Sequence, residues 1–472
     1  MSAGPDPFHD LGATRLAALI RSRDVSPVEI VQAHLDRIEA LEPRINAFVT
    51  VTADTALEAA RALERAMASG ADPGPLGGVP FTVKDCLDTE GVLTQRGSRL
   101  FAGRIPTEDA TAVQRFRQAG AILLGKTNLP EFTLWWETDN ALTGRTNNPW
   151  DLTRTPGGSS GGEAAAIAAG MSPIGIGTDV GISVRGPASL TGIVALKPTH
   201  GRIPLTGNYP PSPNRMWHVG PMARSVADVA LGYALMKGPD GNDGYAAAAA
   251  TAGPGYTRMP GRPLRIGWIT DAVFGPIDPE VAAAVRDVAA LAGRLGHQVE
   301  EVRLEILEHV DCTVVAGAFF AESVPGLQAV ASGWESQLSA RGRVTTRRPA
   351  PSFEALVAAV QTTEQLRSAF AEFFASHDIL LCPVIPFTAP HHGLAKYEVA
   401  GTTVEPAQMM RATMPFNLTG LPALALPAAI SSDYLPIGIQ CVATWNDEET
   451  LLDFAGIIEA LTPAGHRRPS LV

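Results

Sequence analysis

Three segments of the chain carry the side chains best suited to chemistry. Lys84 ends an apolar run, residues 156–162 flank two serines with four glycines, and residues 175–187 form a second glycine-rich passage around one serine. A lysine on such a strand is costly to bury charged, which favours a functional role, although its ammonium reaching solvent or pairing with Asp85 is the simpler alternative. Glycine-rich turns beside a helix N-terminus favour developing negative charge, and successive backbone amides there can form an oxyanion hole. An ordinary Gly/Ser linker is the alternative for 156–162, but the Ala-rich helix expected directly after it argues against free flexibility.

Two further motifs match in letters but fail in context. Residues 120–127 satisfy the phosphate-loop pattern GxxxxGK[ST], yet the four intervening residues, Ala-Ile-Leu-Leu, favour a buried strand over a phosphate-cradling loop. Ser160 is the centre of a GxSxG pattern, which in α/β-hydrolases follows a hydrophobic strand. Residues 148–156, which precede it, have the composition of a loop. We therefore predict neither a nucleotide site nor a nucleophile elbow.

Taken together, the glycine-rich segments are similar to those of a known family. The chain resembles the amidase signature family of serine hydrolases, which use a Ser–cis-Ser–Lys triad, and the likeness covers nearly the whole chain, most specifically residues 76–240. The spacing 183 − 159 = 24 between two of the serines is the family's, and Lys84 lies the expected distance upstream. The matching segments are the helix start Ser26-Pro27, PGGSSGGE at 156–163, GTDVGISVRGPA at 177–188, LKPTHGR at 196–202, GPMARSVAD at 220–228 and FNLTGLPA at 416–423.

The resemblance implies a role for each member of the triad. Ser183 would be the acyl-accepting nucleophile, Ser159 the bridging serine at a non-proline cis peptide, and Lys84 the base. A serine hydroxyl needs an adjacent proton acceptor, and burial can keep a lysine neutral enough to serve. The resemblance implies no metal and no organic cofactor.

The resemblance also assigns the surroundings of the triad. The expected oxyanion hole consists of the backbone amides of Val180, Gly181, Ile182 and Ser183. The residues expected to fix these loops are Ser160, Asp179 and Arg185. The segments that flank the family's substrate channel contain Trp135, Trp136, Met216, Trp217 and His218. Because these side chains are mostly apolar or aromatic, we expect an aryl amide, anilide or carbamate substrate, with esters as further candidates, in preference to a small polar amide. Ordinary packing in the core is the alternative for each of these aromatic side chains.

One position departs from the family pattern. The family usually has Gly-Gly-Ser before the nucleophile, whereas this chain has Gly181-Ile182-Ser183. A β-branched residue resists positive φ, so either the backbone is ordinary here or the oxyanion hole is reshaped. The Ile182 side chain either merely lines the pocket or narrows its acyl side and changes substrate choice.

The elements that position these residues predict an α/β fold. We expect one large domain whose central mixed β-sheet is flanked by helices on both faces. Residues 1–70 are predicted to be helical and to pack on the core, with a capping box beginning at Ser26. Residues 71–245 form the expected catalytic core, 246–262 a connector, and 263–472 the C-terminal part of the same domain, with a helical insertion at about 305–375.

Composition limits the partners and the location. The chain has 472 residues, a formal charge of −11, 45% hydrophobic residues and 18% charged residues. The negative balance without a long basic run argues against nucleic acid or an anionic membrane as partner. Four cysteines far apart predict reduced thiols, and neither a signal peptide nor a membrane span is apparent. We therefore expect a cytoplasmic monomer or homodimer that acts on a small amide or carbamate.

Three functions remain open on the sequence. The first is a stand-alone amidohydrolase, and the second is the catalytic A subunit of a tRNA-dependent glutamine amidotransferase. Glu163 and Ile182 stand where we would expect different residues in that second class of protein, and an apolar channel suits glutamine poorly. The third is a non-catalytic binding protein on the same scaffold, which the complete set of Lys84, Ser159 and Ser183 disfavours.

Overall fold

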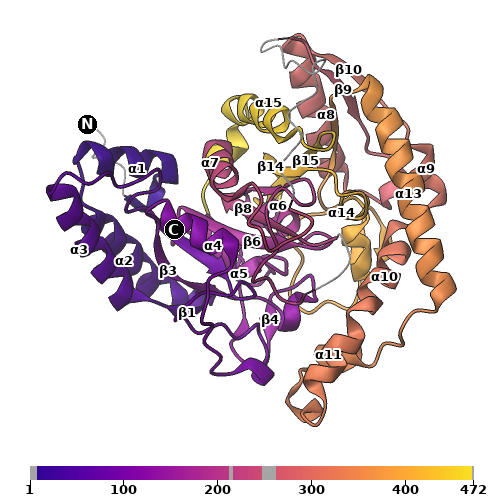
Figure 1. Ribbon diagram of the computed structural model, residues 1–472. Helices are drawn as coiled ribbons and strands as arrows, with labels where there is room; N and C mark the ends of the chain where they lie inside the picture. Colours follow the sequence, from indigo (N-terminus) through magenta and orange to yellow (C-terminus); the bar gives the residue numbers. More distant parts are fainter. Residues whose placement is uncertain (1–7, 212–215, 247–261, 470–472) are drawn as a thin grey trace.

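An eleven-stranded sheet runs through the whole molecule (Figure 1). The computed structural model describes residues 8–211, 216–246 and 262–469. In sheet order the strands are β1 (Phe48–Val51), β3 (Ile122–Thr127), β2 (Pro80–Lys84), β6 (Ile174–Asp179), β8 (His218–Ala223), β7 (Val194–Lys197), β14 (Ala423–Ile430), β15 (Pro436–Val442), β11 (Ile379–Pro383), β9 (Arg265–Trp268) and β10 (Gln298–Glu301). Strands β3, β2 and β6 run parallel, as do β11, β9 and β10, and the remaining pairs are antiparallel. The sheet is therefore mixed, as predicted.

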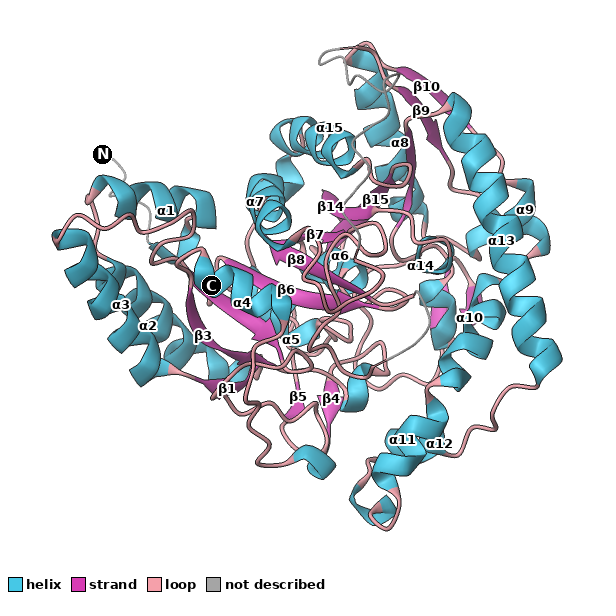
Figure 2. Cartoon of the chain, in the orientation of Figure 1, coloured by secondary structure: helices cyan, strands magenta, loops and turns pink. Residues whose placement is uncertain are grey.

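Helices cover both faces of this sheet (Figure 2). The helices of the first half are α1 (Ala13–Ser22), α2 (Pro27–Ile45), α3 (Ala53–Ala68), α4 (Thr111–Gln118), α5 (Gly161–Ala168), α6 (Arg185–Thr191) and α7 (Val226–Met236). Those of the second half are α8 (Pro279–Arg294), α9 (Glu305–His309), α10 (Cys312–Glu322), α11 (Val324–Ala331), α12 (Ala340–Thr346), α13 (Phe353–Ser376), α14 (Met414–Leu418) and α15 (Glu448–Leu461). Two small hairpins, β4 (Asp139–Asn140) with β5 (Gly144–Arg145) and β12 (Tyr397–Val399) with β13 (Thr402–Val404), stand apart from the main sheet. Helices α1–α3 lie together at one end of the molecule, and α9–α13 lie at the other (Figure 1).

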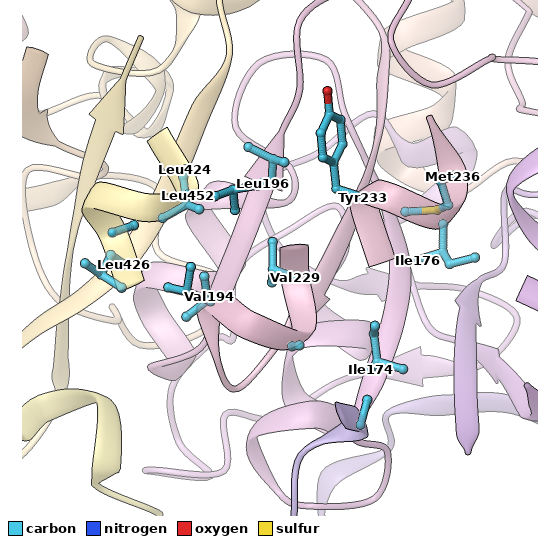
Figure 3. Packing of buried hydrophobic residues seen from close by; sticks show 14 of the residues in the cluster. Ile174, Ile176, Val194, Leu196, Val229, Tyr233, Met236, Leu424, Leu426 and Leu452 are labelled. Atoms are coloured by element: carbon cyan, nitrogen blue, oxygen red, sulfur yellow. The ribbon is translucent and has the colours of Figure 1, made fainter. Parts of the chain in front are cut away.

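Alternation along the strands explains why the sheet needs cover on both faces. Leu424 and Leu426 of β14 belong to the hydrophobic cluster that contains α7 and α15, whereas Ala425 between them belongs to a cluster with α5 and α6. Successive side chains of a strand point to opposite faces, so each face carries its own apolar row. Figure 3 shows the first of these rows, in which side chains of β6, β7 and β14 pack against α7. The predicted architecture, a central mixed sheet between two helical layers, is confirmed.

Local signals at one helix and one strand behave as their chemistry predicts. The capping box of α2 is present, because Glu29 N donates to Ser26 Oγ at 3.1 Å and Ser26 N donates to Glu29 Oε2 at 2.9 Å. The segment with the phosphate-loop pattern forms the buried strand β3. Its lysine, Lys126, is fully buried and donates to the hydroxyls of Thr89 and Thr94 at 2.8 and 3.0 Å. Lys126 thus acts as a hydrogen-bond donor in the interior of the fold.

The expected domain divisions stay predictions, with helices α9–α13 standing where the helical insertion was placed. Most of the predicted connector, 247–261, lies outside the described residues.

All four cysteines are buried free thiols. Within 8–211, 216–246 and 262–469, no single helix is long and apolar enough to cross a bilayer, and α10 with α11 reaches that length and composition only as a pair bent by 41°.

Candidate active site

Lys84 is the last residue of β2 and is fully buried between β3 and β6. Its Nζ donates to Ser159 Oγ at 2.7 Å, to Thr178 Oγ1 at 2.8 Å and to Thr178 O at 3.3 Å. Burial lowers the pKa of Lys84 to about 8, although the nearby Cys86, Asp179 and Glu163 oppose this shift. A substantial fraction of this amine is therefore neutral just above neutral pH, the state in which it can accept a proton.

Ser159 is held at the start of α5 by close backbone contacts. The peptide bond between Gly158 and Ser159 is cis, and a Cβ atom at Gly158 would lie 2.8 Å from the backbone of Trp136. The first amides of the helix are bound as well, since Gly161 N donates to Thr138 Oγ1 at 3.1 Å and Gly162 N to Asn128 O at 3.2 Å. The glycines thus allow the chain to approach neighbouring backbone that any side chain would push away.

Ser183 lies in the turn between β6 and α6, adjacent to the first serine turn. Ser160 N donates to Ser183 O at 3.2 Å, and Ser160 Oγ donates to Thr178 O at 3.2 Å. The Ser183 side chain is nearly buried. No hydrogen bond joins Ser159 Oγ to Ser183 Oγ among those found in the described residues, so proton transfer between these two hydroxyls stays a prediction.

The turn from Val180 to Ser183 leaves its backbone amides unused. Among the hydrogen bonds found within 8–211, 216–246 and 262–469, none has the backbone N–H of Val180, Gly181, Ile182 or Ser183 as donor. Neither Gly181 nor Ile182 has a positive φ, so the isoleucine is accommodated by an ordinary backbone. The Ile182 side chain packs in a buried cluster with Val384 and Ile385. Amides without a partner among the described residues are available as donors, and their role as an oxyanion hole stays a prediction.

A buried ion pair fixes this turn in place. Arg185 Nε donates to Asp179 Oδ2 at 3.0 Å and Arg185 Nη2 to Asp179 Oδ1 at 3.1 Å, with both side chains fully buried. Asp179 Oδ2 also accepts from Val184 N at 3.1 Å. Burial alone would raise the pKa of Asp179, but the Arg185 guanidinium and the amide of Asn417 lower it to about 2. The carboxylate is therefore ionised across the physiological pH range and ties the end of β6 to the start of α6.

Three residues distant in the chain complete this network, and none of them was assigned a role from the sequence. Arg185 Nη1 donates to Thr413 O at 3.1 Å and to Gln440 Oε1 at 3.2 Å. Arg185 Nη2 also bonds Asn417 Oδ1, whose amide nitrogen donates to Asp179 Oδ1 at 2.9 Å. Of the three, only Asn417 carried a signal in the sequence: it stands in the matching segment 416–423, and asparagine is an uncommon residue type inside an apolar stretch.

The predicted pocket residues fall into two groups. Trp135 and Trp136 are half-buried and stack on each other with ring centroids 3.7 Å apart, and the Arg341 guanidinium lies 4.2 Å from the Trp135 ring centroid. Their backbone abuts Gly158, so this pair borders the Ser159 turn. Contact with substrate stays a prediction for both.

The second group, Met216, Trp217 and His218, is buried next to the turn at residues 180–183. Met216 and Trp217 belong to a core cluster that also contains Val180. His218 Nδ1 donates to Met216 O at 2.7 Å, and Lys197 Nζ lies 3.2 Å from His218 Nε2. Burial lowers the pKa of His218 well below its usual range, so the ring is neutral and both of its nitrogens are occupied. His218 thus offers no ring nitrogen to a substrate in this arrangement.

Comparisons with known proteins agree with this geometry. The family model described as Amidase matches residues 29–452. The chain belongs to the amidase signature family. It is 36% identical to the A subunit of the glutamyl-tRNA(Gln) amidotransferase of Acidothermus cellulolyticus, over 95% of this chain and 94% of that protein. Among solved structures it is similar to a 6-aminohexanoate cyclic dimer hydrolase (32% identity, TM-score 0.86, 98% of this chain and 99% of that one) and to a bacterial aryl acylamidase (25%, 0.87, 98% of each).

Family membership fixes the reaction class. The chain is an amidase signature hydrolase that acts on carboxylic amide C–N bonds, and a Ser–Ser–Lys triad is the hallmark of that family. Within the described residues no group of three or more His, Cys, Asp and Glu side chains could hold a metal ion.

Proposed function

We propose that the chain cleaves carboxylic amides through an acyl-enzyme on Ser183. Neutral Lys84 accepts a proton from Ser159 Oγ, Ser159 accepts one from Ser183 Oγ, and Ser183 Oγ attacks the amide carbonyl carbon. The carbonyl oxygen becomes an oxyanion that accepts hydrogen bonds from the amides of residues 180–183. The observation that carries the proposal is the 2.7 Å contact between Lys84 Nζ and Ser159 Oγ, made by a fully buried lysine.

The second half of the reaction reverses the same relay. The C–N bond breaks as the proton held by Lys84 returns through Ser159 Oγ to the departing nitrogen, which leaves as ammonia or an amine while Ser183 Oγ stays bonded to the acyl carbon. Water then adds to the acyl ester, passes a proton to the relay, and the C–O bond to Ser183 breaks to release the carboxylic acid. Protonation of the leaving group matters because an amide anion is a very poor leaving group.

For the substrate, we propose a small-molecule amide hydrolysed by the chain alone. The similarity to 6-aminohexanoate cyclic dimer hydrolase over 98% of the chain supports this function, as does the similarity to an aryl acylamidase. The stacked Trp135 and Trp136 against the Ser159 turn support an apolar substrate group, the basis of our preference for anilides and of carbamates or esters as further candidates.

A second function has direct support from the curated relatives. Proteins named as the A subunit of glutamyl-tRNA(Gln) amidotransferase match at 36% identity over 95–98% of the chain. Their name favours glutamine as the amide more directly than it favours an aryl amide. A chain with this function would work on a substrate attached to tRNA together with partner subunits, contrary to our expectation of no nucleic-acid partner.

A hydrolysis screen separates the two functions. Release of ammonia or amine is measured for glutamine, primary aliphatic amides, anilides, carbamates and esters, with Ser183→Ala as the control. Turnover of anilides or aliphatic amides by the purified chain supports the stand-alone function. Glutamine hydrolysis that appears only with the remaining amidotransferase subunits supports the second function. No Ser183-dependent hydrolysis of any compound in either setting would contradict the acyl-enzyme proposal.

A further inference from the structure

A fully buried carboxyl group lies beside Lys84 and has no role in the relay. Glu163 belongs to the first turn of α5, four residues after Ser159. Thr127 Oγ1 donates to Glu163 Oε2 at 2.7 Å, and Thr82 Oγ1 donates to Glu163 Oε1. Both threonines are neighbours of Lys84: Thr82 precedes it by two residues in β2, and Thr127 is its partner in β3. The carboxyl group therefore ties the helix that follows Ser159 to the two strands that position the lysine.

The sheet is shaped to admit this side chain. Gly175 of β6 pairs with Thr82, and a Cβ atom at Gly175 would lie 1.7 Å from Glu163 Oε1. No residue other than glycine fits there while Glu163 keeps its position. At a second glycine of β6, Gly177, a Cβ atom would lie 2.6 Å from Met222 Sδ, 2.9 Å from Val184 Cγ1 and 3.1 Å from Ser160 Oγ. Glycines in β6 thus allow Ser160 and Glu163, at the start of α5, to lie against the backbone of the sheet.

The charges around this carboxyl group are few and buried. Burial raises the pKa of Glu163 to about 7, while the hydroxyls of Thr82 and Thr127 and the charges of Lys84 and Lys126 oppose that rise. The other charged or titratable groups that face Lys84 are the Cys86 thiol and Asp179, which also oppose the lowering of its pKa, and Asp179 is ion-paired with Arg185. Among the hydrogen bonds and ion pairs of the described residues, none links Glu163 to a cation. No cation in direct contact with Glu163 therefore screens the effect of its negative charge on Lys84.

We propose that Glu163 is a positioning residue that holds the Ser159 turn against Lys84 and, when ionised, increases the proton affinity of that lysine. This inference rests on the proposed function, because it assumes that Lys84 is the base. The hydroxyls of Thr82 and Thr127 donate to both oxygens of Glu163, which favours its ionised form, and the negative charge favours the ammonium form of Lys84 and moves the onset of activity to higher pH.

The test follows covalent labelling of Ser183 by phenylmethylsulfonyl fluoride as a function of pH, read by intact mass. Glu163→Gln keeps the shape and removes the charge, so the midpoint of the labelling rate should fall by about 0.5–1 pH unit. Glu163→Asp keeps the charge but is one methylene shorter, so the midpoint should stay near that of the wild type while the maximal rate drops. The matched control is Glu42→Gln. Glu42 is a half-buried acid in α2 whose pKa is also raised to about 7 and which accepts from the backbone of Ala47 and Phe48, away from Lys84, so its loss should leave the pH midpoint unchanged.

A second variant covers the case in which Glu163→Gln fails to fold, and the labelling of the wild type tests the proposed function separately. If Glu163→Gln does not fold, Thr127→Val removes one hydroxyl donor with little change in shape and should lower the midpoint in the same direction by a smaller amount. An unchanged or raised midpoint in the folded Glu163→Gln protein, or in folded Thr127→Val where the glutamine variant does not fold, would overturn the inference. Wild-type protein that is not labelled at Ser183 at any pH would instead refute the proposed nucleophile.

Discussion

Replacing Arg185 with methionine tests whether the buried ion pair holds the turn at residues 180–183, the proposed oxyanion hole. The guanidinium bonds both oxygens of Asp179, the side chains of Asn417 and Gln440, and the carbonyl of Thr413, all in the interior. Methionine fills similar space but leaves the Asp179 carboxylate buried without its partner. Removing one member of a buried pair costs about 3–5 kcal/mol, so we expect a loss of that size in the free energy of unfolding.

The assay combines urea unfolding with steady-state kinetics on the best amide found in the screen. Because the turn that carries the amides of residues 180–183 loses its anchor, kcat should fall by about 10²-fold or more, the cost of a lost oxyanion donor.

The matched control is Arg117→Met, which breaks the partly exposed pair with Asp109 (3.0 Å) and should cost less than about 1 kcal/mol. The double variant Asp179→Asn, Arg185→Met removes both charges and should recover part of the lost stability. An Arg185→Met protein within about 1 kcal/mol of the wild type, with unchanged kcat, would refute this reasoning.

Three further outcomes are expected. Because the neutral form of Lys84 is the proposed base and its pKa is lowered to about 8, kcat/KM should rise ~10-fold between pH 7 and pH 9, and a flat profile with chemistry limiting would contradict the lysine as base. Ile182→Gly should widen the buried cluster shared with Val384 and Ile385 and shift the preference toward longer acyl groups in an acyl-length series, and an unchanged profile would show that Ile182 only fills space. The pKa of Asp179 is lowered to about 2 in the folded chain, so its contribution to stability is present above pH 4 and disappears as the pH falls toward 2. Acid titration of the unfolding free energy should show Asp179→Asn losing less stability than the wild type over that interval.

Much of the fold could be predicted because its signals are local. The capping box at Ser26 predicts the start of α2, and the apolar run 122–124 correctly outweighs the phosphate-loop letters around Lys126. The order of the eleven strands could not be predicted, because neighbours such as β7 and β14 are paired by tertiary packing across more than two hundred residues.

The candidate site shows the same division. Lys84, Ser159 and Ser183 stand in motifs whose residue types and spacing carry the resemblance. The partners of Arg185 at Asn417 and Gln440 come from α14 and β15, and no local pattern marks them as neighbours of a turn more than 230 residues earlier. Glu163 was visible only as an acid after a glycine run, and its position beside Lys84 follows from the absence of a side chain at Gly175, a contact that only the sheet register reveals.

The most direct test of the account is the covalent labelling of Ser183 with and without the lysine. A sulfonyl fluoride adduct mapped by peptide mass should fall on Ser183 in the wild type, with a rate that rises through about pH 8. In Lys84→Met the adduct rate should drop by about 10²–10⁴-fold, the usual contribution of a general base, and lose that pH dependence. Equal labelling in Lys84→Met, or an adduct on another residue, would contradict the claim that an uncharged, buried Lys84 activates the serine pair.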